Sequence, residues 1–330
     1  MADHADDNGG GDGDVFIYRG GRAPQHITHV LIDKSLDEIE IDAFWNCRRQ
    51  LLQVDTHDGL RKIGKRAFYN CKSLPRINLK SVVEIDKYAF FHCDNLESVE
   101  FGDRLETIGD SAFNGCPLRH LKLPSVTTIG LEAFFSCRSI TDIEFSERLE
   151  TIGTKAFFFC ERLQRIAIPL KRDLFAYDDE KEEYNQFKCC HELATVDLVG
   201  GIHKTVASLH MDSWRSEMTA EINRINQILP IHTTAFRQTD AIQRWMEVVI
   251  DKTDHYKAEH CRYVKEGVTL LELALWKAKL RGGTEDKEDS SVGRQTKKGK
   301  TDSESARKER RITCGADIVI KNVLPFLKLE

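Results

Sequence analysis

Cysteine, histidine and glutamate are the residues of this chain whose positions first suggest chemistry. Residues 189–191 read Cys-Cys-His, and a thiolate beside an imidazole can act as a nucleophile or hold Zn²⁺. A structural zinc site needs further ligands, however, and no Cys-x-x-Cys pair occurs in the sequence. His255 and His260 flank Glu259 but are five residues apart, about 140° round a helix, so they cannot bind one metal together. We therefore expect no catalytic residue, no metal site, no cofactor and no enzymatic activity.

Seven of the ten cysteines recur at regular intervals, which points to structure rather than catalysis. The intervals are 24, 22, 23, 21, 23 and 30 residues. Most of these cysteines end a stretch such as IGKRAFYNC (63–71) or IGTKAFFFC (152–160), in which Phe precedes Cys by three residues. A period near 22 residues is typical of a solenoid, in which each repeat forms one coil and buries its apolar face on its neighbours.

Each repeat carries the signals of two short strands and one helical turn. After the cysteine, an alternation such as Ile-Asn-Leu at 77–79 predicts a strand with one buried face. A second apolar pair follows, such as Val126 and Ile129, and then comes Gly130, where we expect a backbone bend with positive φ. In the AFxxC stretch, Phe and Cys lie on one side of a helical turn, with cysteine acting as a small hydrophobe.

We expect these rings and thiols to form one buried ladder that holds the coils together. The predicted ladder consists of Phe44, Cys47, Phe68, Cys71, Phe90, Cys93, Phe113, Cys116, Phe134, Cys137, Phe157, Cys160, Phe187 and Cys190.

The full repeat, I-G-x-x-A-F-x-x-C-x-x-L-x-x-I-x-L, occurs about six times between Ile39 and Leu198. It resembles the BspA-like leucine-rich repeat, also called leucine-rich repeat type 5. The resemblance implies an α/β solenoid, a right-handed leucine-rich-repeat coil with a parallel sheet, here followed by an all-α unit. It also implies an interaction protein, since members are widespread at bacterial surfaces and expanded in microbial eukaryotes. Residues after about 200 look like the helical tail of some diatom members, to which no activity is attached.

Composition and periodicity divide the chain into five parts. Their expected bounds are 1–14 (disordered acidic and Gly-rich start), 15–203 (solenoid of a cap strand and about six to seven coils), 204–281 (helical hairpin or three-helix unit), 282–311 (disordered charged linker) and 312–330 (apolar helix packing on the helical unit). An acidic insert at 171–184 interrupts the last coil, and we favour a solvated loop there over a site for a basic partner.

The helical part contains three apolar stripes. The first has spacings of 4, 4, 3 and 4 from Trp214 to Leu229, before Pro230; a second helix is expected over about 238–253 and a third over about 254–281. The third carries a seven-residue repeat from Cys261 to Ala278. We favour packing within the chain, as a cap on the solenoid, and keep a homodimer through a coiled-coil seam as the alternative.

The outward positions of the main strands form a candidate concave binding face. Their charges alternate in sign from strand to strand, so neighbours can pair with one another, or the face can bind a protein partner. Both readings stay open. The candidate residues are Arg76, Asn78, Glu100, His120, Lys122, Asp142, Glu144 and Arg165.

The bulk properties restrict the class of partner. The net charge of −5 and the absence of a single-signed stripe give no reason to expect nucleic acid, and no apolar run is long enough to cross a membrane. The N-terminus lacks a signal-peptide pattern, so we expect an intracellular protein, cytoplasmic or nuclear. The favoured function is a non-enzymatic protein–protein interaction scaffold. The alternative is a nuclear or regulatory adaptor that acts through the basic linker and the C-terminal segment.

Overall fold

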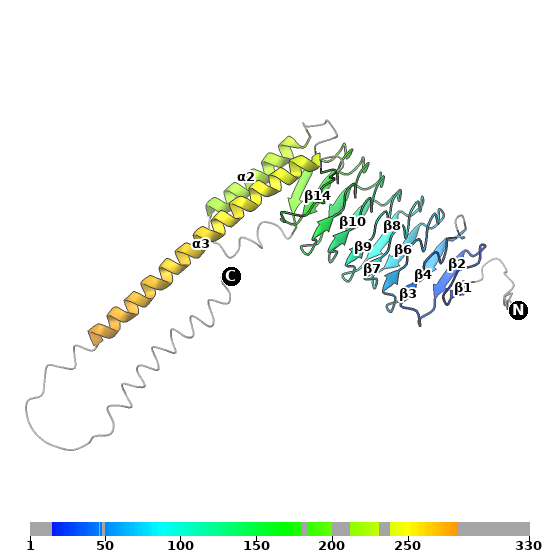
Figure 1. The fold of residues 1–330 in the computed structure, drawn as a ribbon, viewed down its shortest axis with the longest axis horizontal. Coiled ribbons are helices and arrows are strands. Elements are labelled where there is room, and N and C mark those ends of the chain that lie inside the picture. The colour runs from blue at the N-terminus through cyan, green and yellow to red at the C-terminus, as the bar shows by residue number, and fades with distance from the viewer. Residues whose placement is uncertain are drawn as a thin grey trace, which may run out of the picture. The chain divides into compact units, whose positions relative to one another are not determined.

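A computed structural model describes residues 15–45, 47, 50–179, 184–199, 212–230 and 238–282 (Figure 1). The acidic start at 1–14, the tip of the insert at 180–183, nearly all of the linker predicted over 282–311 and the segment 312–330 lie outside the described residues. Predictions made for those parts stay predictions.

The described chain forms two series of parallel strands. Between His29 and Ile152 the longer strands alternate with short ones, so each coil of that range contributes one strand to each series. The longer series is β1 (Val15–Tyr18), β2 (His29–Ile32), β4 (Gln53–Asp55), β6 (Arg76–Leu79), β8 (Ser98–Phe101), β10 (His120–Lys122), β12 (Asp142–Glu144), β14 (Arg165–Ile168) and β15 (Thr195–Leu198). The short series is β3 (Glu38–Ile39), β5 (Lys62–Ile63), β7 (Glu84–Ile85), β9 (Thr107–Ile108), β11 (Thr128–Ile129) and β13 (Thr151–Ile152). The predicted solenoid class is therefore confirmed.

The short strands, rather than the longer ones, form the continuous sheet. They are hydrogen-bonded in one six-stranded order from β3 to β13, whereas the longer strands fall into the groups β1-β2-β4, β6-β8 and β10-β12-β14-β15. The longer strands thus form no single continuous sheet. The break between β8 and β10 falls in the coil where Leu118 follows Cys116 by two residues, although this distance is three in most other coils. We call the outward side of the longer strands the main-sheet face.

The core of the solenoid is a column of stacked phenylalanine rings. From Phe44 to Phe187, neighbouring ring centroids lie 4.9–5.5 Å apart with interplanar angles of at most 11°. All ladder rings and thiols are buried, each at most 1% exposed. The backbone joins the same coils, since the N–H of Phe68, for example, donates to the carbonyl of Ala89 in the next coil at 2.8 Å. No single coil could bury these groups without its neighbours.

The repeat glycines serve close approach between coils, not a positive φ, so our prediction for them was wrong. A Cβ on Gly153 would lie 2.5 Å from the carbonyl carbon of Gly130 in the preceding coil, and one on Gly130 would meet the backbone of Asp110 at 2.6 Å. The positive-φ residues lie two positions after the repeat glycine, as at Lys155, and directly before the cysteine, as at Phe159.

Replacing Gly153 with Ala should therefore destabilise the solenoid, because the new methyl group meets backbone rather than a movable side chain. We expect a loss of about 1–3 kcal/mol in the free energy of unfolding. Gly267→Ala in helix α3 is the matched control, because nothing lies within 4 Å of its Cβ position and alanine favours helix by about 0.5–1 kcal/mol. Urea unfolding followed by circular dichroism tests both. A Gly153→Ala chain as stable as the parent would contradict the close-approach explanation.

The acidic insert is partly built into the solenoid. Leu174 and Phe175 are buried, and the backbone N–H of Ile152 donates to the carbonyl of Leu174 at 2.7 Å. The N–H of Ala176 donates back to the carbonyl of Ile152 at 3.0 Å. The segment 174–176 therefore adds a rung beside β13, and the prediction of a solvated loop was wrong for it.

Two helices follow the last coil, α2 (Asp212–Ile228) and α3 (Gln238–Gly282). The predicted break near residue 253 is absent, because no proline or glycine interrupts the chain between 238 and 266 and the backbone hydrogen bonds can continue. The chain divides into two compact units within α3. The first contains the solenoid, α2 and α3 up to Lys252, and the second contains α3 from Thr253.

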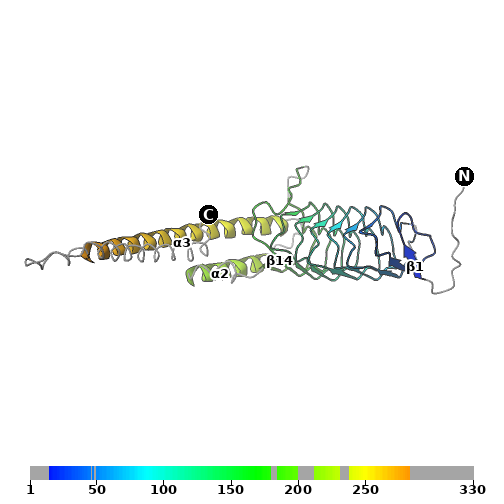
Figure 2. The same cartoon turned by 90° about the horizontal axis from the view of Figure 1, so that it is seen from below.

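Within the first unit, the helices close the C-terminal end of the solenoid (Figures 1 and 2). Their side chains take the positions of the hydrogen-bond partners that a further coil would supply. The N–H of Phe187 donates to Thr239 Oγ1 at 2.9 Å. In earlier coils, the N–H of the corresponding phenylalanine donates to a backbone carbonyl of the following coil. The N–H of Val196 in β15 donates to Asn226 Oδ1 at 2.8 Å, and Gln238 Nε2 donates to the carbonyl of Cys190 at 2.9 Å. These contacts cap the last coil.

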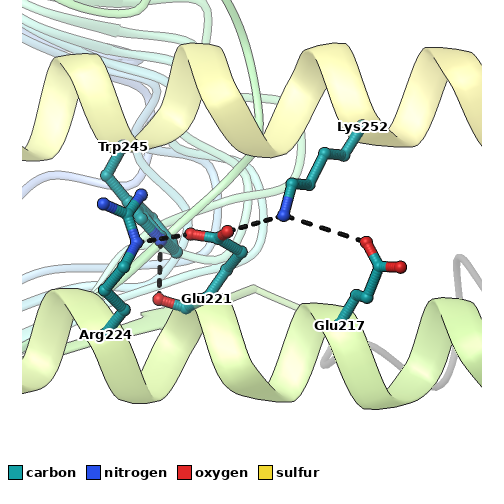
Figure 3. Close-up of polar contacts among 5 residues, drawn as sticks. All are labelled: Glu217, Glu221, Arg224, Trp245 and Lys252. Atoms are coloured by element: carbon teal, nitrogen blue, oxygen red, sulfur yellow. Dashed lines mark hydrogen bonds and ion pairs between the residues drawn. The ribbon is translucent and has the colours of Figure 1, made fainter.

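A buried carboxylate joins the two helices of this cap (Figure 3). Glu221 accepts from Lys252 Nζ at 2.7 Å and from Arg224 Nε at 2.8 Å, and its backbone carbonyl accepts from Trp245 Nε1 at 3.0 Å. Lys252 also reaches Glu217 at 3.8 Å. Burial alone would raise the pKa of Glu221, but the hydrogen bonds from Lys252 and Arg224 outweigh it and lower the pKa. The carboxylate therefore stays charged and holds α2 against α3.

Candidate binding face of the solenoid

The eight predicted face residues lie on the outward side of the longer strands. In register, Arg76 faces Ser98 and Asn78 faces Glu100 across β6 and β8. Six of the eight are exposed, while Asp142 and Arg165 are half-buried. The strands thus hold these side chains in two columns, although the columns are interrupted where β8 and β10 do not pair.

Across the second part of the face, neighbours occupy adjacent strands. His120 lies opposite Asp142, Lys122 lies opposite Glu144, and Asp142 lies opposite Arg165. The columns therefore present both signs of charge within a few side chains of each other.

Neighbouring polar side chains pair on part of this face, which is one of the two readings that the sequence leaves open. Lys122 Nζ lies 3.6 Å from Glu144 Oε2, and His120 Nδ1 lies 3.5 Å from Asp142 Oδ2. Glu100 pairs with Lys80 at 2.8 Å rather than with Lys122, whose strand β10 does not pair with β8. That hydrogen bond lowers the pKa of Glu100 and raises the pKa of Lys80.

Arg165 makes the tightest ion pair of the face, with Asp197 at 2.7 Å rather than with its neighbour Asp142. The Lys122 side chain is 83% exposed, and solvent-exposed pairs of this kind contribute little to stability.

An apolar group at the start of the same face was missed. Val15 and Ile17 in β1 and Leu31 in β2 point outward and are 52%, 43% and 41% exposed. The predicted face begins at Arg76, so it does not include β1, β2 or β4. VFIY and HVLI are almost wholly apolar, so no alternation of apolar and polar residues marked an outward side there.

A second column of aromatic side chains runs beside the buried phenylalanines, at the position directly after each of them. Tyr69 stacks on Phe91 at 5.1 Å and Phe135 stacks on Phe158 at 5.5 Å. Asn114 interrupts the column between these pairs. The doubled aromatics in AFY and AFF could have revealed it. The half-buried members are Trp45, Tyr69, Phe91, Phe135 and Phe158.

The ladder cysteines do more than fill space. The thiol of Cys137 donates to the carbonyl of Phe113 in the preceding coil at 3.0 Å. In the same way, the thiol of Cys93 donates to the carbonyl of Phe68 at 3.1 Å. The remaining five make the same kind of bond, Cys47 to Pro24 and the others to a phenylalanine carbonyl, at 3.1–3.4 Å. A thiol is both apolar enough for this core and able to donate a weak hydrogen bond.

Burial should make these thiols unreactive. It raises the pKa of Cys47 to about 11 and the pKa of Cys116, Cys137 and Cys160 well above the ordinary value. Thiols whose pKa is raised in this way stay protonated at pH 8, and the thiolate is the reactive form.

We expect Ellman's reagent at pH 8 to modify Cys261, which is half-exposed, and to reach the ladder only in urea. A Cys314→Ser background removes the one cysteine outside the described residues. The Cys261→Ser chain is the control, since it should lose the rapid modification that the parent chain shows at Cys261. Rapid modification of several cysteines in the folded chain would contradict a buried ladder.

The residues considered first for chemistry do not converge on a site. His255 Nε2 lies 3.9 Å from Glu259 Oε2 along one helix turn. Across the described ranges, no group of three or more His, Cys, Asp or Glu side chains is arranged to hold a metal. Of the two described helices, neither combines the length and the apolar character needed to cross a bilayer.

Comparison with known proteins identifies the repeat. The chain matches the family described as the BspA type leucine rich repeat region in six copies, over residues 23–137, 62–179 and 127–246. No curated protein matches the sequence.

Solved structures of bacterial leucine-rich repeat proteins are similar at low identity. The Treponema pallidum leucine-rich repeat protein is 23% identical, with 56% of this chain and 73% of that chain covered and a TM-score of 0.37. A Bacteroides ovatus leucine-rich repeat protein is 20% identical, with 52% and 55% covered and a TM-score of 0.35. The pneumococcal vaccine antigen PcpA is 20% identical, with 57% and 67% covered and a TM-score of 0.31.

The matched ranges run from residue 23 to residue 246, more than half of the chain, and the described coils contain the strands, ring column and thiols of the repeat. The chain therefore belongs to the BspA-type leucine-rich repeat family.

Proposed function

We propose that this protein is a non-enzymatic scaffold that binds another protein through the main-sheet face. The observation that carries the proposal is the array of exposed, weakly paired charges held on parallel strands, with Lys122 at its centre. A rigid sheet presents such side chains with little loss of conformational entropy on binding. Repeat solenoids commonly use an extended surface in this way.

The charge pattern favours a partner of mixed charge. Lysine, arginine and acidic side chains alternate on the face, so a partner with the complementary alternation would replace the present pairs one for one. A strongly acidic or strongly basic polymer would meet like charges on every second strand. The partner we propose is therefore a folded protein rather than nucleic acid.

The end of α3 supports a recruitment or dimerisation role for the second unit. Leu270, Leu273 and Trp276 are exposed there, on a helix whose apolar residues from 270 to 276 occupy most of its circumference. A helix that is apolar all round is normally covered by other segments.

We further propose that the protein works inside the cell. The nine described cysteines are free thiols, eight of them buried, and a reducing compartment keeps them in that state. The adaptor alternative depends on residues 283–330, which lie outside the described residues.

Affinity capture with a charge-reversed face tests the proposal. The full chain, Lys122→Glu and Lys72→Glu are used as baits, and captured proteins are quantified by mass spectrometry. Lys72 is the matched control, because it carries the same charge and one exposed ion pair, with Asp94 at 2.8 Å, but lies outside the longer strands. If the Lys122→Glu chain fails to capture proteins that the Lys72→Glu chain still captures, the result supports binding through the main-sheet face. Equal capture by all three baits would exclude it.

A further inference from the structure

A seven-residue repeat of apolar positions runs along α3 beyond the cap. The contacts described for the cap involve α3 only up to Lys252. Farther along, apolar or small residues follow at spacings of 3, 4, 3, 4 and 3, and we call this set the α3 seam: Cys261, Val264, Val268, Leu271, Leu275 and Ala278. The side chains of Leu271 and Leu275 are 53% and 42% exposed. In a coiled coil, residues with this spacing occupy the first and fourth positions of each repeat and face a partner helix.

The α3 seam is complementary to itself when two copies run antiparallel. A first position then faces a fourth position, so Val268 of one copy lies opposite Leu271 of the other. In the same register Val264 lies opposite Leu275, and the outermost pair is Cys261 with Ala278. Each contact occurs twice, once in each direction, as a two-fold interface requires. One register therefore uses all six positions.

The charged side chains beside the seam select the same register. Lys265 and Glu272 each come directly after a fourth position, and antiparallel helices bring these flanking positions together. With the seams aligned, Lys265 of each copy lies beside Glu272 of the other. Among the described residues neither side chain makes an ion pair, so both charges are available. A shift by one repeat would instead place Lys265 beside Lys265 or Glu272 beside Glu272, which is repulsive.

Other occupants match the seam less well. A parallel second copy would bring Lys265 beside His260 and Glu272 beside Gly267, so neither would meet an opposite charge. The C-terminal residues 312–330 are apolar, but only 13 of them precede Pro325, which would interrupt a helix, and the seam spans 18 residues.

We propose that the α3 seam joins two copies of this chain as an antiparallel coiled coil, flanked by two ion pairs between Lys265 and Glu272. This inference specifies the dimerisation role proposed for the second unit and rests on that role, but it is independent of the main-sheet face. The overlap of 18 residues is about 27 Å long at 1.5 Å per residue. Such an interface is small, so the dimer dissociates on dilution.

Sedimentation velocity of the full chain over about 1–100 µM tests whether the dimer forms. We expect the chain to pass from monomer to dimer over this range. Leu271→Glu should leave it monomeric throughout, because the charge would be buried in the seam. Leu273→Glu is the matched control, since Leu273 is 59% exposed on the same helix but lies outside the seam. Circular dichroism verifies that both variants are folded.

A charge exchange tests the register. Lys265→Glu or Glu272→Lys alone places like charges together at both ends of the seam and should raise the dissociation constant roughly tenfold. The double variant Lys265→Glu, Glu272→Lys restores opposite charges and should recover the parent value. The two residues are seven positions apart on one helix, about 10 Å, so recovery reports a contact between copies.

Disulfide formation tests the direction of the helices. In a Cys261→Ser, Cys314→Ser background, the pair Val264→Cys, Leu275→Cys should give a covalent dimer on mild oxidation. Val264→Cys alone should give none, whereas a parallel dimer would link this position to itself. The two positions lie about 16 Å apart on one helix, so they cannot bond within a chain.

Three results overturn the proposal: a monomer at every concentration, as expected if residues 312–330 cover the seam; a dimer that Leu273→Glu dissociates and Leu271→Glu does not; or a covalent dimer of Val264→Cys alone. Failure of the charge exchange to recover the parent dissociation constant also excludes the antiparallel register. The Lys122→Glu chain should dimerise like the parent, so loss of the dimer and loss of binding at the main-sheet face are distinguishable.

Discussion

Replacing Phe134 with alanine should lower the free energy of unfolding by about 3–5 kcal/mol. The ring is fully buried between Phe113 at 5.3 Å and Phe157 at 5.1 Å, both stacked parallel to it. Its removal takes apolar area from the core and leaves a cavity with no side chain nearby to fill it, because the adjacent rings are themselves fixed by the repeat. Urea unfolding followed by circular dichroism measures the loss.

The next residue provides the control. Phe135 is half-buried and belongs to the outer aromatic column, so Phe135→Ala should cost clearly less than Phe134→Ala. Because each coil contacts only its neighbours, the Phe134→Ala chain should also show a broader transition as the two halves of the solenoid separate. Equal losses for the two variants would mean that the buried column is not the principal support of the fold.

Replacing Trp245 with alanine should open the cap that α2 and α3 form at the C-terminal end of the solenoid. The side chain is 2% exposed and donates from Nε1 to the carbonyl of Glu221, which ties α3 to α2. We expect a loss of about 3–5 kcal/mol in the free energy of unfolding, the usual range for a buried tryptophan. The backbone N–H groups of Phe187 and Val196 should exchange with solvent faster, since their acceptors Thr239 and Asn226 belong to the same helices.

Trp276→Ala is the matched control for this experiment. The Trp276 side chain lies on the same helix but is 68% exposed, so its loss should leave the solenoid unchanged. Comparable destabilisation by the two substitutions would show that the end of α3 stabilises the fold as much as the cap does. Unchanged exchange at Phe187 and Val196 in the Trp245→Ala chain would remove the capping role from α2 and α3.

The candidate binding face was only partly predictable. The outward residues of the later strands could be named from alternation, because a strand places successive side chains on opposite faces. Their actual partners could not, since long side chains choose among several neighbours: Glu100 pairs with Lys80, and Arg165 pairs with Asp197. The apolar start of the face at Val15 and Ile17 lies before the first full repeat and carries no periodic signal.

The sequence alone determined the coil, the family resemblance and the identity of the buried rings and thiols, because a period near 22 residues repeats the same physical requirement in every coil. Tertiary structure decided what depends on the distance between coils or on contacts between distant segments. The repeat glycines are required because a Cβ there would lie 2.5–2.7 Å from backbone atoms of the preceding coil. Each ladder cysteine donates to a carbonyl 23 to 33 residues away, and Thr239 completes a coil 52 residues earlier. Such contacts leave no local pattern, since the residues that make them are separated in the chain and meet only after the solenoid has formed.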